Sequence, residues 1–142
     1  MIIGVPKESY PGERRVALVP MVIPSLVKAG FEVLVETGAV AEAGYPDTLY
    51  VEKGAKVLPD RGAVFGGCGY RRPGSMCYGS NDVTGQADLP LLRSEQVLVG
   101  FLRPLGSVDV IQETAQTGVI SFAEELMPRT DLRPRALRFG GS

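Results

Sequence analysis

Met1-Ile2-Ile3-Gly4-Val5-Pro6-Lys7-Glu8-Ser9-Tyr10-Pro11-Gly12-Glu13-Arg14-Arg15-Val16-Ala17-Leu18-Val19-Pro20 opens the chain and decides its fold class. Residues 2–5 are apolar and include no charged group, which is typical of a strand buried on both faces of a parallel sheet. Pro6 follows at once, and because proline has no backbone N–H it ends the ladder of hydrogen bonds. The sequence therefore predicts a short buried parallel strand at the amino terminus.

The segment after this strand is a loop rich in charge. It contains Lys7, Glu8 and Arg15, with Pro11-Gly12 predicted to form a turn before the apolar residues 16–23. In open parallel sheets, ligands bind beyond the carboxyl ends of the strands. Lys7, Glu8 and Arg15 are therefore the candidate site residues, either in contact with a substrate or at the rim of a ligand cleft. No residue is assigned a catalytic role.

Strand and helix patterns alternate along the rest of the chain. Apolar spacing and turn residues predict helices at 21–29, 48–53 and 108–117, with a helical turn at 59–65. Asp47 is the expected N-cap of the second helix. Strands are expected at 31–36, 55–58, 96–102 and 119–122. This alternation predicts an α/β domain whose mostly parallel sheet is covered on both faces and joined by right-handed crossovers.

Composition excludes several classes of function. With 15 basic and 16 acidic residues and a net charge of -1, the 142-residue chain has no strong field for nucleic acid or anionic lipid. It contains no histidine, so imidazole chemistry and the usual nitrogen ligands of zinc are absent, and no metal site is expected. We expect Cys68 and Cys77 to be reduced thiols. No apolar run is long enough to span a bilayer, so no direct membrane insertion is expected.

Several motifs resemble one known family. Residues 4–8 (Gly-Val-Pro-Lys-Glu) and 11–20 (Pro-Gly-Glu-Arg-Arg-Val-Ala-Leu-Val-Pro), followed by 30–39, 43–45 and the pair Gly54-Ala55, are similar to the amino-terminal domain shared by alanine dehydrogenase and the alpha subunit of proton-translocating NAD(P) transhydrogenase. The resemblance implies a flavodoxin-like layered domain that packs, in the intact protein, beside a Rossmann-type domain that binds NAD.

That second domain is expected to be absent from this chain. No Gly-x-Gly-x-x-Gly pattern opens a helix after a strand, and Gly66-Gly67-Cys68-Gly69 runs into Arg71-Arg72-Pro73, where a helix does not begin easily. We therefore expect no tight binding of NAD or NADP to this chain alone, although the resemblance implies both as cofactors of the family.

Within the family, the sequence is more similar to transhydrogenase. In alanine dehydrogenase the strand corresponding to Val97–Leu102 is followed by a histidine that acts on the substrate, whereas here Arg103-Pro104-Leu105 follows. The resemblance thus implies the amino-terminal portion of a transhydrogenase alpha subunit, whose reaction is hydride transfer from NADH to NADP coupled to proton translocation. We expect the chain, as a truncated domain, to be inactive by itself. The alternatives are an alanine dehydrogenase-like fragment and a non-catalytic dimerisation or scaffold remnant.

The same resemblance implies partners and location. The partners would be a missing NAD-binding domain and the membrane subunits of the transhydrogenase, and a second copy of the chain is a further candidate. The expected location is cytoplasmic, with peripheral attachment at the inner face of the membrane through those partners. In alanine dehydrogenase an arginine at the position of Arg15 holds the substrate carboxylate. In a transhydrogenase we expect Arg15 to be structural or at the cleft rim.

Two segments depart from the family pattern. The family-like domain is predicted to span 1–129, with 66–90 divergent and 130–142 a divergent, disordered tail. Residues 66–85 carry six glycines and both cysteines, so we expect a mobile excursion in place of the central strand and lysine of the family. Out-of-frame translation of a family gene would explain both segments, because the pattern returns near Leu92 with nearly the expected spacing. A long surface insertion is the alternative.

Overall fold

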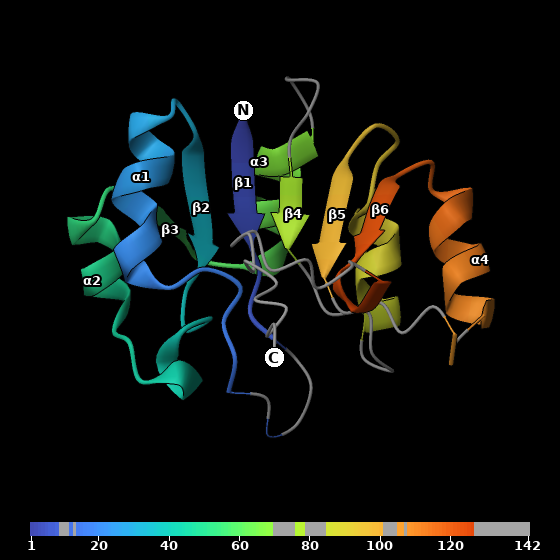
Figure 1. The fold of residues 1–142 in the computed structure, drawn as a ribbon, viewed down its shortest axis with the longest axis horizontal. Helices are drawn as coiled ribbons and strands as arrows, with labels where there is room; N and C mark the ends of the chain where they lie inside the picture. Colours follow the sequence, from blue (N-terminus) through green and yellow to red (C-terminus); the bar gives the residue numbers. More distant parts are fainter. Residues whose placement is uncertain are drawn as a thin grey trace, which may run out of the picture.

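A computed structural model describes residues 1–8, 12, 14–69, 76–78, 85–100, 105–106 and 108–126. They form one sheet of six parallel strands with helices against it (Figure 1). The strands are β1 (Ile2–Val5), β2 (Glu32–Glu36), β3 (Lys56–Leu58), β4 (Met76–Tyr78), β5 (Val97–Gly100) and β6 (Ile120–Ala123). The α-helices are α1 (Ile23–Lys28), α2 (Asp47–Glu52), α3 (Arg61–Gly69) and α4 (Val108–Gln116). Short 3-10 helices are η1 (Pro20–Val22), η2 (Ala41–Ala43), η3 (Gly85–Leu91) and η4 (Glu124–Leu126).

The strand order is β3-β2-β1-β4-β5-β6, and every neighbouring pair is parallel. The predicted layered α/β class with a parallel sheet is confirmed. This order is that of the doubly wound dinucleotide-binding folds, whereas flavodoxin-like sheets have the order 2-1-3-4-5. Because the chain runs outward from β1 in one direction and then returns to start β4 on its other side, the switch point lies between β1 and β4.

Two apolar cores lie on the two faces of the sheet. The first contains Ile3 and Val5 of β1 with Val33 and Val35 of β2, covered by residues from α1 and α2 such as Tyr50. The second is built around Val64, Phe65 and Cys68 of α3 with Leu98 of β5. The side chains of β1 and β2 alternate between the faces, so the continuous apolar runs of these strands reflect burial on both sides. The crossover helix α3 therefore lies on the opposite face from α1 and α2.

Local signals at the helix ends are largely confirmed. Pro24 lies in the first turn of α1, and Gly30 follows the helix with a φ of +89°, as expected for a C′ glycine. Asp60 caps α3, because its Oδ1 accepts the N–H of Ala63 at 2.8 Å. The N-cap prediction for Asp47 is wrong. Asp47 is the first helical residue of α2 and makes no cap hydrogen bond.

The expectation of a strandless excursion at residues 66–85 is wrong. Helix α3 continues through Gly69, and β4 fills the central position between β1 and β5, pairing Met76 with both Ile3 and Val97. Three residues suffice because both neighbours supply ladder partners, so pairing overrides weak strand propensity. Residues 70–75 and 79–84, like the predicted tail at 130–142, lie outside the described residues.

The adjacent glycines of α3 differ in their surroundings. A Cβ at Gly66 would meet nothing within 4 Å, whereas a Cβ at Gly67 would lie 2.5 Å from Cδ1 of Leu34, a buried residue of β2. We expect Gly66→Ala to raise the free energy of unfolding by about 0.5–1 kcal/mol through helix propensity. Gly67→Ala gains the same propensity but overpacks the core, so it should lower stability by about 1 kcal/mol. Urea unfolding of both variants tests this, and equal effects would contradict it.

Candidate functional site

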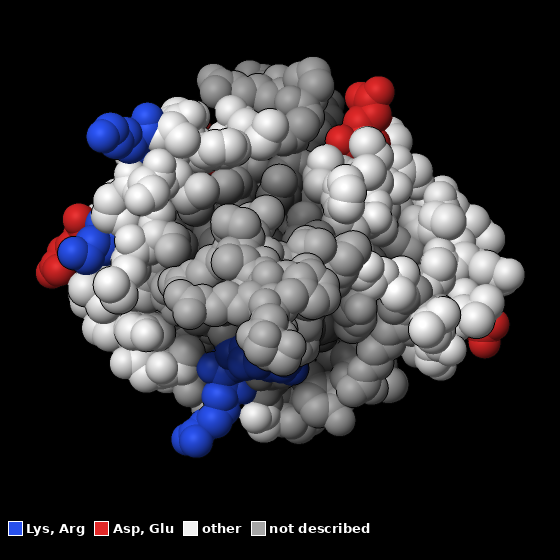
Figure 2. Space-filling model, in the orientation of Figure 1, with Lys and Arg blue, Asp and Glu red and all other residues white. Residues whose placement is uncertain are grey.

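The carboxyl ends of all six strands lie at one edge of the sheet, the lower edge in Figure 1. The loop that carries Lys7 and Glu8 begins there, directly after β1 and the buried Pro6. Figure 2 shows basic side chains gathered at this end of the molecule, and in that view no acidic side chain of the described residues lies beside them. Because ligands of doubly wound sheets bind beyond the carboxyl ends near the switch point, this edge is the candidate site.

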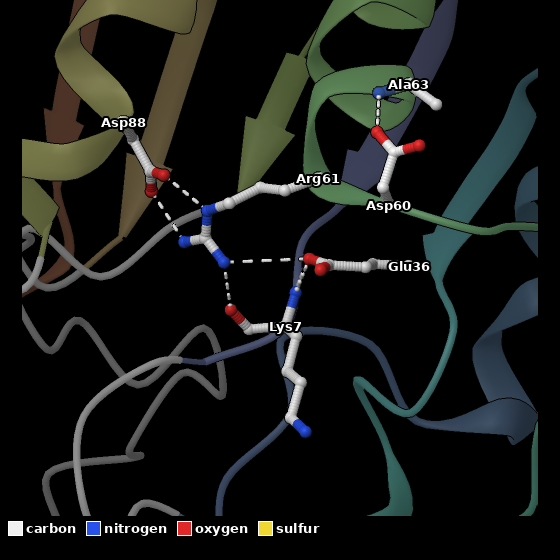
Figure 3. Close-up of polar contacts among 6 residues, drawn as sticks. All are labelled: Lys7, Glu36, Asp60, Arg61, Ala63 and Asp88. Atoms are coloured by element: carbon white, nitrogen blue, oxygen red, sulfur yellow. Dashed lines mark hydrogen bonds and ion pairs between the residues drawn. The ribbon is translucent and has the colours of Figure 1, made fainter.

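One guanidinium organises this edge. Arg61, the first residue of α3, binds the carboxylate of Asp88 in η3 through two N–H groups, with Nη2 2.6 Å from Oδ2 and Nε bound to Oδ1. Its Nη1 donates to the carbonyl oxygen of Lys7 at 2.5 Å and lies 3.6 Å from Oε2 of Glu36, the last residue of β2 (Figure 3). We call Lys7, Glu36, Arg61 and Asp88 the Arg61 cluster.

The cluster is largely buried and charged. The side chains of Asp88, Glu36 and Arg61 are 9%, 15% and 23% exposed. Burial lowers the pKa of Arg61, but the hydrogen bond with Asp88 and the negative charges of Asp88, Glu36 and Glu8 outweigh it, so the pKa of this guanidinium is raised overall. Arg61 is therefore a permanent cation whose donors are used by groups of the protein itself.

The cluster joins four elements of the fold. Lys7 follows β1, Glu36 ends β2, Arg61 begins α3 and Asp88 belongs to η3, which connects β4 to β5. The backbone N–H of Lys7 also donates to Oε2 of Glu36 at 2.7 Å. These contacts link the half of the sheet before the switch point to the half after it.

The predicted site residues have different places in this arrangement. Lys7 is part of the cluster through its backbone, and the charge of Glu8 acts on Arg61. Arg15 is exposed on the segment leading to η1 and is not among the groups that bind Arg61. Sequence reasoning missed Arg61 and Asp88. Their contacts span 27 and 54 residues of chain, so no local motif identifies them.

A second set of hydrogen bonds fixes the turn after β2, beside Lys7. The carboxylate of Asp47 accepts the hydroxyl of Thr37 at 2.7 Å and the N–H of Gly38 at 3.1 Å. Gly38 has a φ of +70°, and a Cβ there would lie 3.9 Å from Nζ of Lys7. The ammonium group of Lys7 therefore lies close to this turn.

Tyr50 of α2 anchors the segment that follows Arg15. Its buried hydroxyl donates to the carbonyl oxygen of Leu18 at 2.6 Å. Burial, with a smaller effect of nearby Tyr45, raises the pKa of Tyr50 to about 12. An unfolded tyrosine titrates near pH ~10. The folded state thus keeps the proton to higher pH, and stability from Tyr50 is complete below pH ~10 and is lost as the pH rises toward ~12.

The Tyr50→Phe variant tests this anchor. It should lower the free energy of unfolding by about 1 kcal/mol at neutral pH, because the carbonyl oxygen of Leu18 loses its donor. It should also reduce the loss of stability between pH ~10 and ~12. Chemical unfolding across this pH range measures both effects. The control Tyr45→Phe should retain the alkaline loss, and parallel pH profiles for wild type and Tyr50→Phe would refute the assignment.

The described residues hold few other features that suggest chemistry. Cys68 is buried in the second core and is free. No group of three or more Cys, Asp or Glu residues in the described ranges could hold a metal ion. No helix in the described part of the chain is long and apolar enough to cross a membrane. Gly66-Gly67-Cys68-Gly69 lies inside α3, so it does not form a turn before a helix as a phosphate-binding loop does.

The parallel sheet, its strand order and the charged loop after β1 define an α/β domain of the doubly wound class. Residues 4–139 match the family described as Alanine dehydrogenase/PNT, N-terminal domain. The chain therefore belongs to this family.

Several relatives share the domain. The NAD(P) transhydrogenase subunit alpha of Cereibacter sphaeroides is 31% identical over 91% of this chain and 23% of that protein. The alanine dehydrogenase of Bacillus subtilis is 47% identical over 42% of this chain and 16% of that protein. The crystal structure of transhydrogenase from Sinorhizobium meliloti superimposes with a TM-score of 0.78 and 29% identity, covering 92% of this chain and 37% of that one. The chain thus spans about a quarter of the length of the Cereibacter relative.

Proposed function

We propose that this chain is the amino-terminal domain of an NAD(P) transhydrogenase alpha subunit and takes part in hydride transfer from NADH to NADP coupled to proton translocation. The observation that carries the proposal is the extent of the similarity. Transhydrogenase alpha subunits of two organisms are 31% and 32% identical over 91% of the chain, whereas the Bacillus subtilis alanine dehydrogenase matches over 42%. The absence of histidine also favours transhydrogenase, because the substrate histidine implied for alanine dehydrogenase has no counterpart.

In this proposal, NAD and NADP bind to other regions of the transhydrogenase. The domain contributes the charged loop after β1, with Lys7, Glu8 and Arg15 at the rim of the nucleotide cleft. The NAD-binding domain and the membrane subunits are the partners, and the location is at the inner face of the membrane through them. The Arg61 cluster supports this role because it holds the start of that loop in one conformation.

The test is a domain exchange. Residues 4–139 would replace the corresponding domain of the NAD(P) transhydrogenase alpha subunit of Rhodospirillum rubrum, which is 32% identical over 133 residues. Hydride transfer from NADH to NADP would then be measured in membranes that hold the other subunits. Retained transfer is the expected result. A folded chimera that binds NADH as the parent does but transfers no hydride would contradict the proposal.

Alanine dehydrogenase is the second candidate, favoured by the 47% identity over 60 residues with the Bacillus subtilis enzyme. The same chimera distinguishes it, because reduction of NAD that depends on L-alanine would support it. A non-catalytic scaffold is the third candidate. It predicts a normally folded chain with no measurable nucleotide affinity in either context.

The chain alone should bind NADH weakly. Since it lacks a glycine-rich turn before a helix, we expect a Kd no better than about 1 mM, equivalent to about -4 kcal/mol. Titration of the purified chain with NADH, followed by nucleotide fluorescence, measures this. Binding in the micromolar range would show that the nucleotide site has been placed in the wrong region of the protein.

A further inference from the structure

Arg61 does not behave as a free anion-binding arginine. Its Nε and Nη2 are used by the carboxylate of Asp88, and its Nη1 is used by the carbonyl oxygen of Lys7, with Glu36 nearby. An arginine that binds a ligand directly needs donors that point outward in a fork. The donors of Arg61 point inward, so its effect on a ligand must pass through the residues it holds.

Lys7 is the residue that Arg61 holds most directly. Its carbonyl oxygen accepts from Arg61, and its N–H donates to Glu36 at 2.7 Å, so both polar groups of its backbone are fixed. With the backbone fixed on both sides, the direction of the side chain is also restricted. Figure 3 shows the Lys7 ammonium pointing away from Glu36 and Asp88.

The ammonium is left available for a ligand. No hydrogen bond or ion pair engages Nζ of Lys7 within the described part of the chain, because Glu36 is used by the Lys7 N–H and by Arg61. Nζ lies close to Gly38, which has no side chain to cover it, and Asp47 holds that turn in place. The result is a fixed, exposed cation at the carboxyl ends of β1 and β2, the edge at which doubly wound sheets bind ligands.

We infer that the Lys7 ammonium binds an anionic oxygen of the ligand, a phosphate or a carboxylate, and that Arg61, itself held by Asp88, is the positioning residue that aims it. This inference rests on the proposed function for the identity of the full ligand, but the two can fail separately. A lysine acts on such groups as a point charge and needs only the right direction, which the two backbone hydrogen bonds supply.

The experiment uses the complete 142-residue chain at low ionic strength. Inorganic pyrophosphate and pyruvate serve as the phosphate and carboxylate probes, and binding is followed through the side-chain resonances of Lys7 by NMR. Lys7→Gln should weaken binding of the preferred probe about fivefold, and Arg61→Lys about threefold, because lysine cannot hold Asp88 and the Lys7 carbonyl together. Lys56→Gln removes an equal charge from an exposed pair with Glu32 and should change nothing.

The double variant separates positioning from a general structural effect. If Arg61 acts through Lys7, Arg61→Lys should cause no further loss once Lys7 is glutamine, so the combined effect stays about fivefold. Multiplied losses of about fifteenfold would overturn the positioning role. Where Arg61→Lys does not fold, Asp88→Asn gives the same cycle. Binding of both probes that is unaffected by Lys7→Gln overturns the inference, even if the domain-exchange chimera transfers hydride normally.

Discussion

The Arg61→Met variant is expected to lose about 3 kcal/mol of its free energy of unfolding. Methionine keeps much of the apolar volume but leaves the nearly buried carboxylate of Asp88 without its bidentate partner. It also removes the donor to the Lys7 carbonyl and the cation beside Glu36. Breaking a buried ion pair by removing one member typically costs about 3–5 kcal/mol, because the remaining charge stays desolvated. Urea unfolding followed by circular dichroism measures the loss.

The matched control is Lys56→Met, which breaks the 2.7 Å pair with Glu32 where the lysine side chain is 67% exposed. An exposed pair of this kind contributes little, so the control should stay within about 0.5 kcal/mol of wild type. The Arg61→Met effect should also persist at high ionic strength, because ~1 M salt screens buried charges far less than surface charges. A loss below about 1 kcal/mol would mean that solvent reaches Asp88 freely and that the cluster does not hold the two halves of the sheet together.

Most of the fold could be predicted from local patterns. The strand at Ile2–Val5 is an apolar run stopped by Pro6, and the end of α1 is marked by Gly30 at a positive φ. In each case the physical cause lies within a few residues of the chain, so sequence reasoning reaches it. The similarity of the opening residues to a known family then indicated the layered architecture, which the structure confirms.

The central strand could not be predicted in this way. Met76–Tyr78 is only three residues long, and its strand conformation depends on ladder partners in β1 and β5. The neighbouring glycines of α3 pointed toward a loop, yet Gly67 is placed where its missing Cβ leaves room for Leu34 of β2. Both features are decided by contacts between segments far apart in sequence, and propensity carries no information on those contacts.

The candidate site divides in the same way. Lys7 and Glu8 follow the first strand, so the rule for open sheets was enough to place them at the ligand edge. Arg61 and Asp88 belong to a crossover helix and a connection that approach this edge only after folding. A charged residue at a helix start is ordinarily a solvated group, and only the three-dimensional contacts show that this one is committed to the backbone of Lys7.

The Phe65→Ala variant is expected to lose about 3–4 kcal/mol of stability, the other large effect. Phe65 is 1% exposed in the second core, one turn along α3 from Arg61, and its ring centroid lies 6.0 Å from the guanidinium carbon. Removing the ring leaves a cavity between α3 and the sheet, which accounts for most of the cost. It also removes the aromatic face against which the guanidinium packs. Denaturant unfolding of the purified variant measures the loss.

Phe65→Leu separates these two contributions. Leucine refills most of the cavity, so this variant should lose only about 1 kcal/mol through packing, yet it lacks the aromatic face just as alanine does. A double-mutant cycle with Arg61→Met then reports the contact itself, and we expect a coupling energy of about 0.5–1 kcal/mol between Phe65→Leu and Arg61→Met. Strict additivity would mean that the apolar core and the Arg61 cluster are independent. In that case the position of Lys7 would depend on its hydrogen bonds alone, without support from the packing of α3 against the sheet.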